Sequence, residues 1–257
     1  MTTKKIRLGI ISALLEEQAG LIHSMEPATT VNRGMRDYVA GKLWEIDCVC
    51  VLSRIGKVAA AATVTTLIER FDVTHIIFTG VAGSAAQHVN VGDIVIAHDL
   101  VQHDMDASPL VPRFEVPLTG LHKFDADSYL NEVLTQAAES FIEHDYPQVI
   151  KPSDQQAFNL NSPRVLHGLI ASGDEFITCS QKIAGLKSAL PALLAVEMEG
   201  AAVAQVCFEF GIPFAVIRTI SDKADADASI DFKRFIDRVA CHYAFNIIQR
   251  ACFSLVK

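Results

Sequence analysis

The amino-acid sequence predicts an α/β fold in which a single domain, residues 1–257, contains a mixed β-sheet flanked by helices on both faces. Short apolar runs alternate with longer amphipathic stretches along the chain, which is the pattern of strands alternating with helices. The runs at residues 38–43 and 46–52 follow each other like the arms of a hairpin, which predicts a mixed rather than a purely parallel sheet. We find no linker, internal repeat or low-complexity segment that would divide the chain.

The elements are expected in a regular order. The apolar run 6–12 predicts a buried first strand, and the stretch 16–25 predicts a helix. After the hairpin-like pair, the Ala-rich stretch 57–71 predicts a second helix, and the run 74–79 predicts a strand. Further strands are predicted at 94–97, 165–171, 194–198 and 213–220, and further helices at 125–144, 199–210 and 232–253. The Pro-containing segment 101–123 is the least regular part, which is typical of a lid, a binding loop or an interface.

Composition excludes several classes of function. Half of the residues are hydrophobic, which allows a sizeable core, and the net charge of −8 comes without a basic stripe, which disfavours nucleic-acid and anionic-membrane binding. No run approaches the roughly 18–20 apolar residues that span a bilayer, and Arg7 interrupts the N-terminal apolar stretch, which argues against a signal peptide. The six cysteines lack metal-ligand spacing, which predicts buried reduced thiols in a cytoplasmic protein without metal or cofactor.

Two acidic clusters carry the strongest functional signal. Glu199 and Asp222 each follow an apolar run, and ligands bind at the ends of such strands in open α/β folds. Glu199 is typical of a carboxylate that accepts hydrogen bonds from ribose hydroxyls, or of ordinary charge at a helix start. Asp222 is placed for proton transfer or as a helix-capping residue. Arg218 lies within the apolar run before Asp222, so a buried partner is expected for it.

Three other segments are candidates for a binding site. Glu16 and Glu17 open the first predicted helix, either to complement its N-terminus or to point a carboxylate into a cleft. The small residues at 80–83 predict a loop or tight turn that lets a planar ligand approach the backbone, and they match neither the dinucleotide fingerprint nor the P-loop. Phe176 is either a core aromatic residue or a stacking surface for a flat ring. We interpret His103 and Asp104 as a surface pair rather than a catalytic dyad.

Together these segments resemble the nucleoside phosphorylase/nucleosidase superfamily, and most closely the 5′-methylthioadenosine/S-adenosylhomocysteine nucleosidases. The matching motifs occur in the family's order and span roughly residues 6 to 250. They are Gly-Ile-Ile-Ser-Ala with Glu16 and Glu17, Ile-Gly-Lys-Val-Ala-Ala at 55–60, Thr-Gly-Val-Ala-Gly at 79–83, Val-Gly-Asp-Ile-Val at 91–95, Ser-Gly-Asp-Glu-Phe-Ile at 172–177, Val-Glu-Met-Glu-Gly-Ala-Ala at 196–202 and Arg-Thr-Ile-Ser-Asp at 218–222.

The resemblance implies a role for each matching residue. Glu17 would position and deprotonate the attacking water, and Asp222 would protonate the purine at N7. Glu199 would hold the ribose hydroxyls, Met198 would pack under the sugar, and Phe176 would stack on the base. The remaining implied substrate-site residues are Ala82, Gly83, Ile177, Glu197, Arg218 and Ser221, of which Ile177 reads the base edge through its backbone, while Ser221 and Arg218 support the acid and the water.

The implied activity is hydrolysis of the N-glycosidic bond of methylthioadenosine or adenosylhomocysteine, which releases adenine and a 5-thioribose product. The resemblance also implies a cytoplasmic homodimer that acts in methionine salvage, with a small nucleoside as its substrate. Phosphorolysis by a purine nucleoside phosphorylase of the same fold and non-catalytic nucleoside binding are the alternatives. Carboxylates at 16–17, where phosphorylases usually place phosphate-binding groups, repel phosphate and favour hydrolysis.

Three departures from the family pattern bear on this expectation. Val81 stands where a serine is common, which removes a hydroxyl group near the water. Arg54 stands where a glycine is usual, and an additional cation there would attract an anionic co-substrate. The segment 101–123 also differs from the family, in which this region contributes to the dimer interface and to the pocket for the 5′ substituent.

Overall fold

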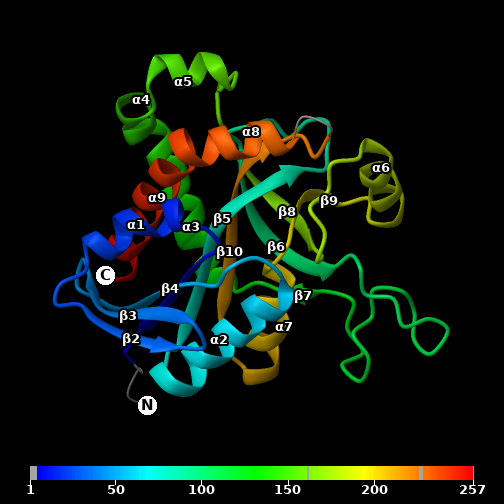
Figure 1. Cartoon of the computed structure of the whole chain (residues 1–257), viewed down its shortest axis with the longest axis horizontal. Coiled ribbons are helices and arrows are strands. Elements are labelled where there is room, and N and C mark those ends of the chain that lie inside the picture. Colours follow the sequence, from blue (N-terminus) through cyan, green and yellow to red (C-terminus); the bar gives the residue numbers. More distant parts are fainter. Residues whose placement is uncertain (1–4, 161, 226–227, 257) are drawn as a thin grey trace.

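The computed structural model describes residues 5–160, 162–225 and 228–256, and its strands form one mixed sheet (Figure 1). The strands of these residues are β1 (Arg7–Ser12), β2 (Thr29–Arg33), β3 (Arg36–Leu43), β4 (Ile46–Leu52), β5 (His75–Ser84), β6 (Ile94–Gln102), β7 (Phe124–Asp125), β8 (Val165–Ser172), β9 (Leu193–Glu197) and β10 (Phe214–Asp222). Their order is β10-β6-β8-β9-β5-β1-β4-β3-β2, with β7 beside β6 and an additional pairing between β10 and β5. The mixed α/β fold class predicted from the sequence is confirmed.

The pairing of β10 with β5 closes part of the sheet into a ring. The strands β4, β1, β5 and β10 run parallel to one another, and so do β6, β8 and β9. The two sets are antiparallel where β10 meets β6 and where β5 meets β9. Strands β5 and β9 pair only through their last residues, Gly83 with Val196 and Ser84 with Ala195. This short seam brings the carboxyl ends of both parallel sets to one place.

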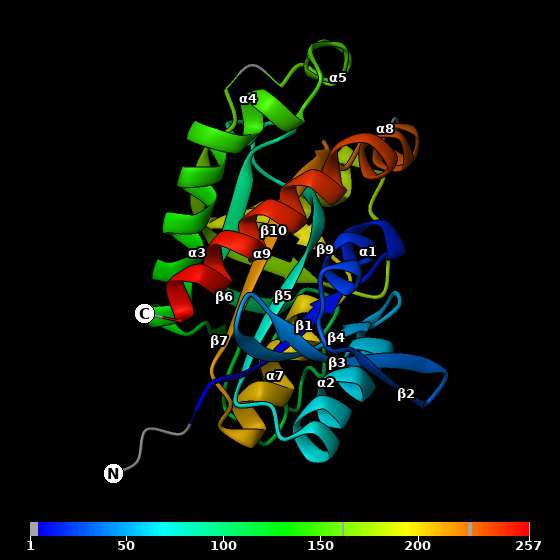
Figure 2. The same cartoon turned by 90° about the vertical axis from the view of Figure 1, so that its left-hand side faces the viewer.

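Helices cover both faces of the sheet. They are α1 (Leu15–His23), α2 (Lys57–Phe71), α3 (Ser128–Ser140), η1 (Phe141–Asp145), α4 (Tyr146–Val149), α5 (Pro152–Ala157), α6 (Ser180–Ala189), α7 (Gly200–Phe210), α8 (Ala228–Phe235), η2 (Ile236–Ala240) and α9 (Cys241–Leu255), where η denotes a π-helical turn. Figure 2 shows α3 alongside α9 and, elsewhere on the molecule, α2 alongside α7. None of the described helices combines the length and apolar character needed to cross a bilayer.

The core divides into layers because side chains of a strand alternate between its two faces. In β10, Ile217 packs with Leu134 of α3 in one apolar cluster, whereas the preceding Val216 packs with Val64 of α2 and Val203 of α7 in another. A strand that is covered on both faces has apolar residues at nearly every position. This continuous apolar pattern allowed β1, β5 and β10 to be predicted from the sequence.

Several sequence predictions are confirmed and several are wrong. The helix 57–71 and the antiparallel pair β3–β4 are confirmed. Residues 80–83 do not form a loop, because they continue β5 to Ser84 and pair with β10 or β9. Tertiary pairing here outweighs the low strand propensity of glycine. The helix predicted over 125–144 starts only at Ser128, because the Asp127 side chain caps it by accepting a hydrogen bond from the Leu130 N–H at 2.8 Å.

Candidate active site

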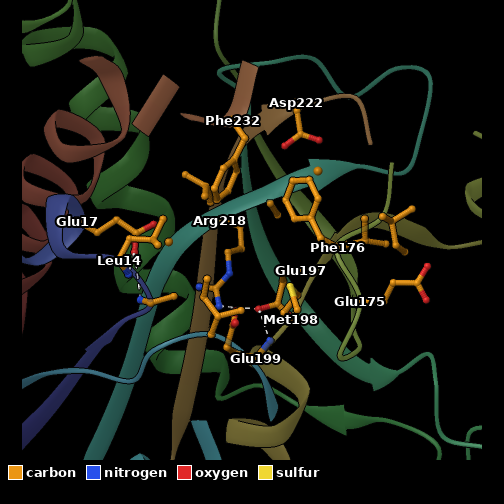
Figure 3. Close-up of a pocket in the computed structure, with 18 residues that line it drawn as sticks. Leu14, Glu17, Glu175, Phe176, Glu197, Met198, Glu199, Arg218, Asp222 and Phe232 are labelled. Atoms are coloured by element: carbon orange, nitrogen blue, oxygen red, sulfur yellow. Dashed lines mark hydrogen bonds and ion pairs between the residues drawn. The ribbon is translucent and has the colours of Figure 1, made fainter. Parts of the chain in front are cut away.

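A pocket of about 350 Å³ opens at the seam between the two parallel sets of strands (Figure 3). Its described walls come from β5, β9 and β10, from the segments at the starts of α1, α2 and α7, from the turn after β8 and from α8. Each predicted site residue except Ser221 lines it: Glu17, Ala82, Gly83, Phe176, Ile177, Glu197, Met198, Glu199, Arg218 and Asp222. The pocket therefore combines residues up to 219 positions apart, from Ala13 to Phe232, which no local sequence pattern records.

Glu17 places one carboxylate oxygen on protein donors and leaves the other facing the pocket. Its Oε2 accepts hydrogen bonds from the backbone N–H groups of Ala13 and Leu14, both at 3.1 Å. Its Oε1 is buried and has no hydrogen-bond partner among the described residues. Burial raises the pKa of Glu17 to about 7, although the nearby Arg218 guanidinium opposes the shift. The carboxylate can thus take up or release a proton near neutral pH.

Gly80 makes room for Glu17 and Arg218 to approach each other. A Cβ atom at this position would lie 3.3 Å from Glu17 Oε1 and 3.4 Å from Arg218 Nη1. The first distance is tighter than ordinary van der Waals contact, and the second is at its lower limit. The glycine in the middle of β5 therefore leaves room over its Cα for these two side chains and does not mark a turn.

Arg218 and Glu197 form an ion pair inside the molecule, which confirms that Arg218 needs a buried partner. Arg218 Nη2 lies 2.8 Å from Glu197 Oε2, and the two side chains are 1% and 3% exposed. The guanidinium also donates to the carbonyl oxygen of Phe78 at 3.0 Å and lies 4.0 Å above the Phe78 ring centroid.

Glu197 lines the pocket, but its oxygens bind protein groups. They accept hydrogen bonds from the Ser172 hydroxyl and from the Gly200 N–H, the latter at 2.8 Å to Oε2. Glu197 therefore satisfies the N-terminus of α7 and neutralises Arg218. Glu197 lies in the pocket wall, and its contacts hold the start of α7 and the Arg218 guanidinium in place.

Glu199 occupies the N-cap position of α7 and points back toward α2. Its Oε1 accepts a hydrogen bond from the Gly56 N–H at 2.8 Å, and the residue is 5% exposed. Burial and the negative charge of Glu197 raise the pKa of Glu199 to about 8. Met198 lines the pocket beside it, as predicted.

Asp222 ends β10 and is held from two sides. Its Oδ2 accepts the Ser221 hydroxyl at 2.7 Å, and its Oδ1 accepts the Ala224 N–H at 2.8 Å. Ser221 does not line the pocket, and one of its contacts with the site is this hydrogen bond to Asp222. A Cβ atom at Gly83 would lie 2.9 Å from Asp222 Oδ1 and 3.1 Å from the Ala224 Cβ, so a side chain there would displace the Asp222 carboxylate.

An aromatic pair forms part of the wall. Phe176 is 41% exposed and meets Phe232 of α8 edge to face, with ring centroids 5.3 Å apart. Eight residues that line the pocket were not among the predicted site residues: Ala13, Leu14, Ile55, Gly80, Val81, Glu175, Val196 and Phe232. The only signal for Phe232 was its place at the start of the last predicted helix.

Two of the family departures do not enter the pocket. Arg54 is exposed and donates to the carbonyl oxygen of Met35 at 2.6 Å, so the expected extra cation does not line the described pocket. No residue of segment 101–123 lines it either, whereas Val81 does. The interpretation of His103 as a surface residue is wrong, because it is 3% exposed and its ring packs against Gly173.

Two further findings concern metal ligands and thiols. Among the described residues, His98, Asp99 and Asp125 bring potential ligand atoms within 4.8 Å of one another, away from the pocket lining, and Lys123 pairs with Asp99. The six cysteines are free, but Cys179 is exposed and Cys241 is partly exposed, so the expectation of buried thiols holds only for the others.

Comparison with known proteins agrees with this architecture. A family model described as the phosphorylase superfamily matches residues 7–251, and the chain belongs to that superfamily. Within it, the chain is 35% identical over 244 residues to the 5′-methylthioadenosine/S-adenosylhomocysteine nucleosidase of Shewanella halifaxensis, which covers 95% of this chain and 97% of the relative. The chain is therefore a member of the methylthioadenosine/adenosylhomocysteine nucleosidase family, as the resemblance predicted.

Solved structures give the same result. The corresponding nucleosidase of Neisseria meningitidis, in complex with methylthio-immucillin-A, matches with a TM-score of 0.84 and 31% identity over 96% of this chain and 99% of that one. Futalosine hydrolase of Helicobacter pylori matches with a TM-score of 0.82 and 29% identity over 97% of this chain and 98% of that one.

Loss of the buried cation should destabilise the fold. We expect Arg218→Met to lower the free energy of unfolding by about 3–5 kcal/mol, because Glu197 would remain charged and unpaired in the interior. The double variant Arg218→Met/Glu197→Gln should recover part of this loss. Lys5→Met, which breaks an ion pair whose lysine is 74% exposed, should stay within about 1 kcal/mol of wild type. Chemical denaturation measures all three, and equal losses for Arg218→Met and Lys5→Met would contradict the assignment.

Proposed function

We propose that this chain hydrolyses the N-glycosidic bond of methylthioadenosine or adenosylhomocysteine and releases adenine and the 5-thioribose product. One observation carries the proposal: Glu17 presents a buried oxygen without a described partner to a pocket that Asp222 also lines. Figure 3 places the two carboxyl groups on different walls. Glycosidic hydrolysis with inversion uses two carboxyl groups that flank the bond with room for water between them.

The proposed reaction assigns one proton transfer to each carboxyl group. Glu17 accepts a proton from water as the water oxygen bonds to C1′ of the ribose. The C1′–N9 bond breaks, its electron pair passes to the purine, and Asp222 donates a proton to N7. Glu199 accepts hydrogen bonds from the ribose hydroxyls, with Met198 beneath the sugar. Phe176 stacks on the base, whose edge meets the backbone of Ile177, and Ala82 and Gly83 supply a wall without bulky side chains.

The charge of the pocket supports water rather than phosphate as the nucleophile. Arg218 is the only lysine or arginine among the described lining residues, and Glu197 neutralises it. Deprotonated Glu17 adds a negative charge beside this neutral pair, so an incoming phosphate would be repelled, whereas positive charge developing on the sugar would be stabilised.

A substrate panel tests the reaction and the substrate class. We expect free base from methylthioadenosine and adenosylhomocysteine at equal rates with and without phosphate, and much slower release from adenosine and inosine. Futalosine belongs in the panel, because the hydrolase of that name is a structural neighbour. A ribose 1-phosphate product formed only with phosphate would show phosphorolysis instead. Ligand binding without release of any base would show a non-catalytic nucleoside-binding protein.

The pKa of Glu17 predicts a pH dependence. Glu17 must lose its proton to accept one from water, so kcat should rise as the pH rises through about 7. Glu17→Gln should lower kcat by about 10²–10⁴-fold and remove this rise. The exposed neighbour provides the control, since Glu16→Gln should keep the rate and the rise and move the rise only slightly to lower pH, because the charge of Glu16 helps to raise the pKa of Glu17. Asp222→Asn should also cut turnover while still binding an inhibitor, and near-normal turnover would reject its role as the acid.

We further propose that the protein is a cytoplasmic homodimer and that it takes part in methionine salvage. Its free cysteines are typical of a reducing compartment. Met35, Ile55 and Val58 are 74%, 57% and 81% exposed near the start of α2, an apolar surface suited to a second copy. Light scattering should give twice the 28.0 kDa mass of one chain, and Val58→Glu should reduce it to a single chain. A wild-type monomer would contradict the proposal.

A further inference from the structure

One carboxylate outside the pocket, that of Asp104, brings together three chain segments: its own segment after β6, the start of α2 and the turn after β8. Asp104, in the segment after β6, accepts a hydrogen bond from Lys57 Nζ through Oδ1 at 2.6 Å. Its Oδ2 accepts the backbone N–H of Asp174 at 3.0 Å. Asp174 in turn accepts the backbone N–H of Lys57 through its own Oδ1 at 2.7 Å. These three residues form a closed set of contacts, which we call the Asp104 tie.

Two of the joined segments lead directly into the pocket. Lys57 follows Gly56, whose N–H donates to Glu199 Oε1 at 2.8 Å, and Ile55 before it lines the pocket. Asp174 precedes Phe176 and Ile177, which line the opposite part of the wall. The Asp104 tie therefore connects two parts of the site. One is Gly56, whose N–H donates to Glu199, and the other is the segment that carries Phe176.

The position of Asp104 is itself fixed from the side of β8. The backbone N–H of His103 donates to the carbonyl oxygen of Ser172 at 2.9 Å. The His103 ring fills the space beside Gly173, where a Cβ atom would lie 2.2 Å from its Cε1. Lys57 is fixed as well, because its Nζ also donates to Gln102 Oε1 at 3.1 Å. The side chain of Lys57 is 17% exposed and that of Asp104 is 34% exposed, so the Asp104 carboxylate stays partly in contact with water.

We propose that Asp104 is a positioning residue for substrate binding: it holds the Gly56 N–H against Glu199 and the Phe176 segment across the pocket from it. This role rests on the proposed function, because it concerns the walls that would bind sugar and base. Asp104 does not line the described pocket, so it acts through Lys57 and Asp174 without touching the ligand.

Glu199 supplies a readout that a purely structural residue would leave unchanged. The charged groups facing it are Glu197 from β9, Arg218 from β10 and Glu17 from α1, and the Gly56 N–H from the start of α2 completes its surroundings. Burial and Glu197 raise its pKa, whereas the Gly56 N–H and Arg218 lower it. A displaced Gly56 N–H would therefore raise this pKa further, so that Glu199 is protonated over a wider pH range.

The first experiment compares Asp104→Asn with a matched control. We expect Asp104→Asn to lower kcat/KM about 10-fold, mainly through KM, because small displacements of binding groups are costly. 1/KM should rise with pH as Glu199 loses its proton and becomes able to bind the ribose hydroxyls. In Asp104→Asn, the pH of this rise should move upward by roughly 0.5–1 unit. Asp99→Asn removes a comparable ion pair, with Lys123 at 3.1 Å, outside the pocket lining, and should leave both values unchanged. Lys57→Met added to Asp104→Asn should cause little further loss, since both act through one tie.

A second measurement does not depend on turnover. Amide hydrogen exchange in the unliganded protein should become faster in segments 54–58 and 172–177 of Asp104→Asn, and not in Asp99→Asn. Unchanged exchange in both segments, or kinetics of Asp104→Asn within twofold of wild type, would overturn the positioning role. If the wild-type protein releases no base, the proposed function fails, and the exchange result then decides alone whether the tie holds the two segments.

Discussion

The ion pair between Arg218 and Glu197 is the interaction on which the rest of the site depends. It spans from β10 to β9, which lie on the two sides of β5 in the closed part of the sheet. Glu197 also holds the N-terminus of α7, and Arg218 holds a backbone oxygen of β5. Removing two charges from water costs free energy that offsets much of the attraction between them. The pair therefore contributes more by joining several elements than by its net effect on stability. It specifies how the two parallel sets of strands meet.

An excess of negative charge around that pair gives the pocket its chemical character. Three carboxyl groups, Glu17, Glu197 and Glu199, lie near one guanidinium. Burial is the main cause that raises the pKa of Glu17 and of Glu199, and the charge of Glu197 adds to it at Glu199. The result is raised pKa values at Glu17 and Glu199, which keep both groups close to their titration range at neutral pH. An unsatisfied carboxylate in a buried pocket is stabilised when positive charge appears beside it, as it does on a sugar during glycosidic cleavage.

Prediction from the sequence succeeded where local periodicity reports burial directly. The helix 57–71 was predicted with its observed bounds because its alanines and buried positions follow one helical face. The short strand β2, the two-residue β7 and the helix α6 were missed, since exposed or very short elements leave little apolar pattern. Residues 80–83 were taken for a loop because glycine suggests a turn, whereas pairing with β9 and β10 keeps them extended.

The sequence by itself determined which residue types stand at the ends of buried strands: Glu17 after β1, Glu197 and Glu199 around the end of β9, and Asp222 at the end of β10. Their motifs were sufficient to indicate the family and to name ten of the residues that line the pocket. Only the tertiary structure decided what each one contacts. It paired Glu197 with Arg218, left Glu17 Oε1 facing the cavity, buried His103 and tied Lys57 to Asp104. Local patterns report burial and backbone conformation, whereas these contacts join residues brought together when the sheet closes on itself.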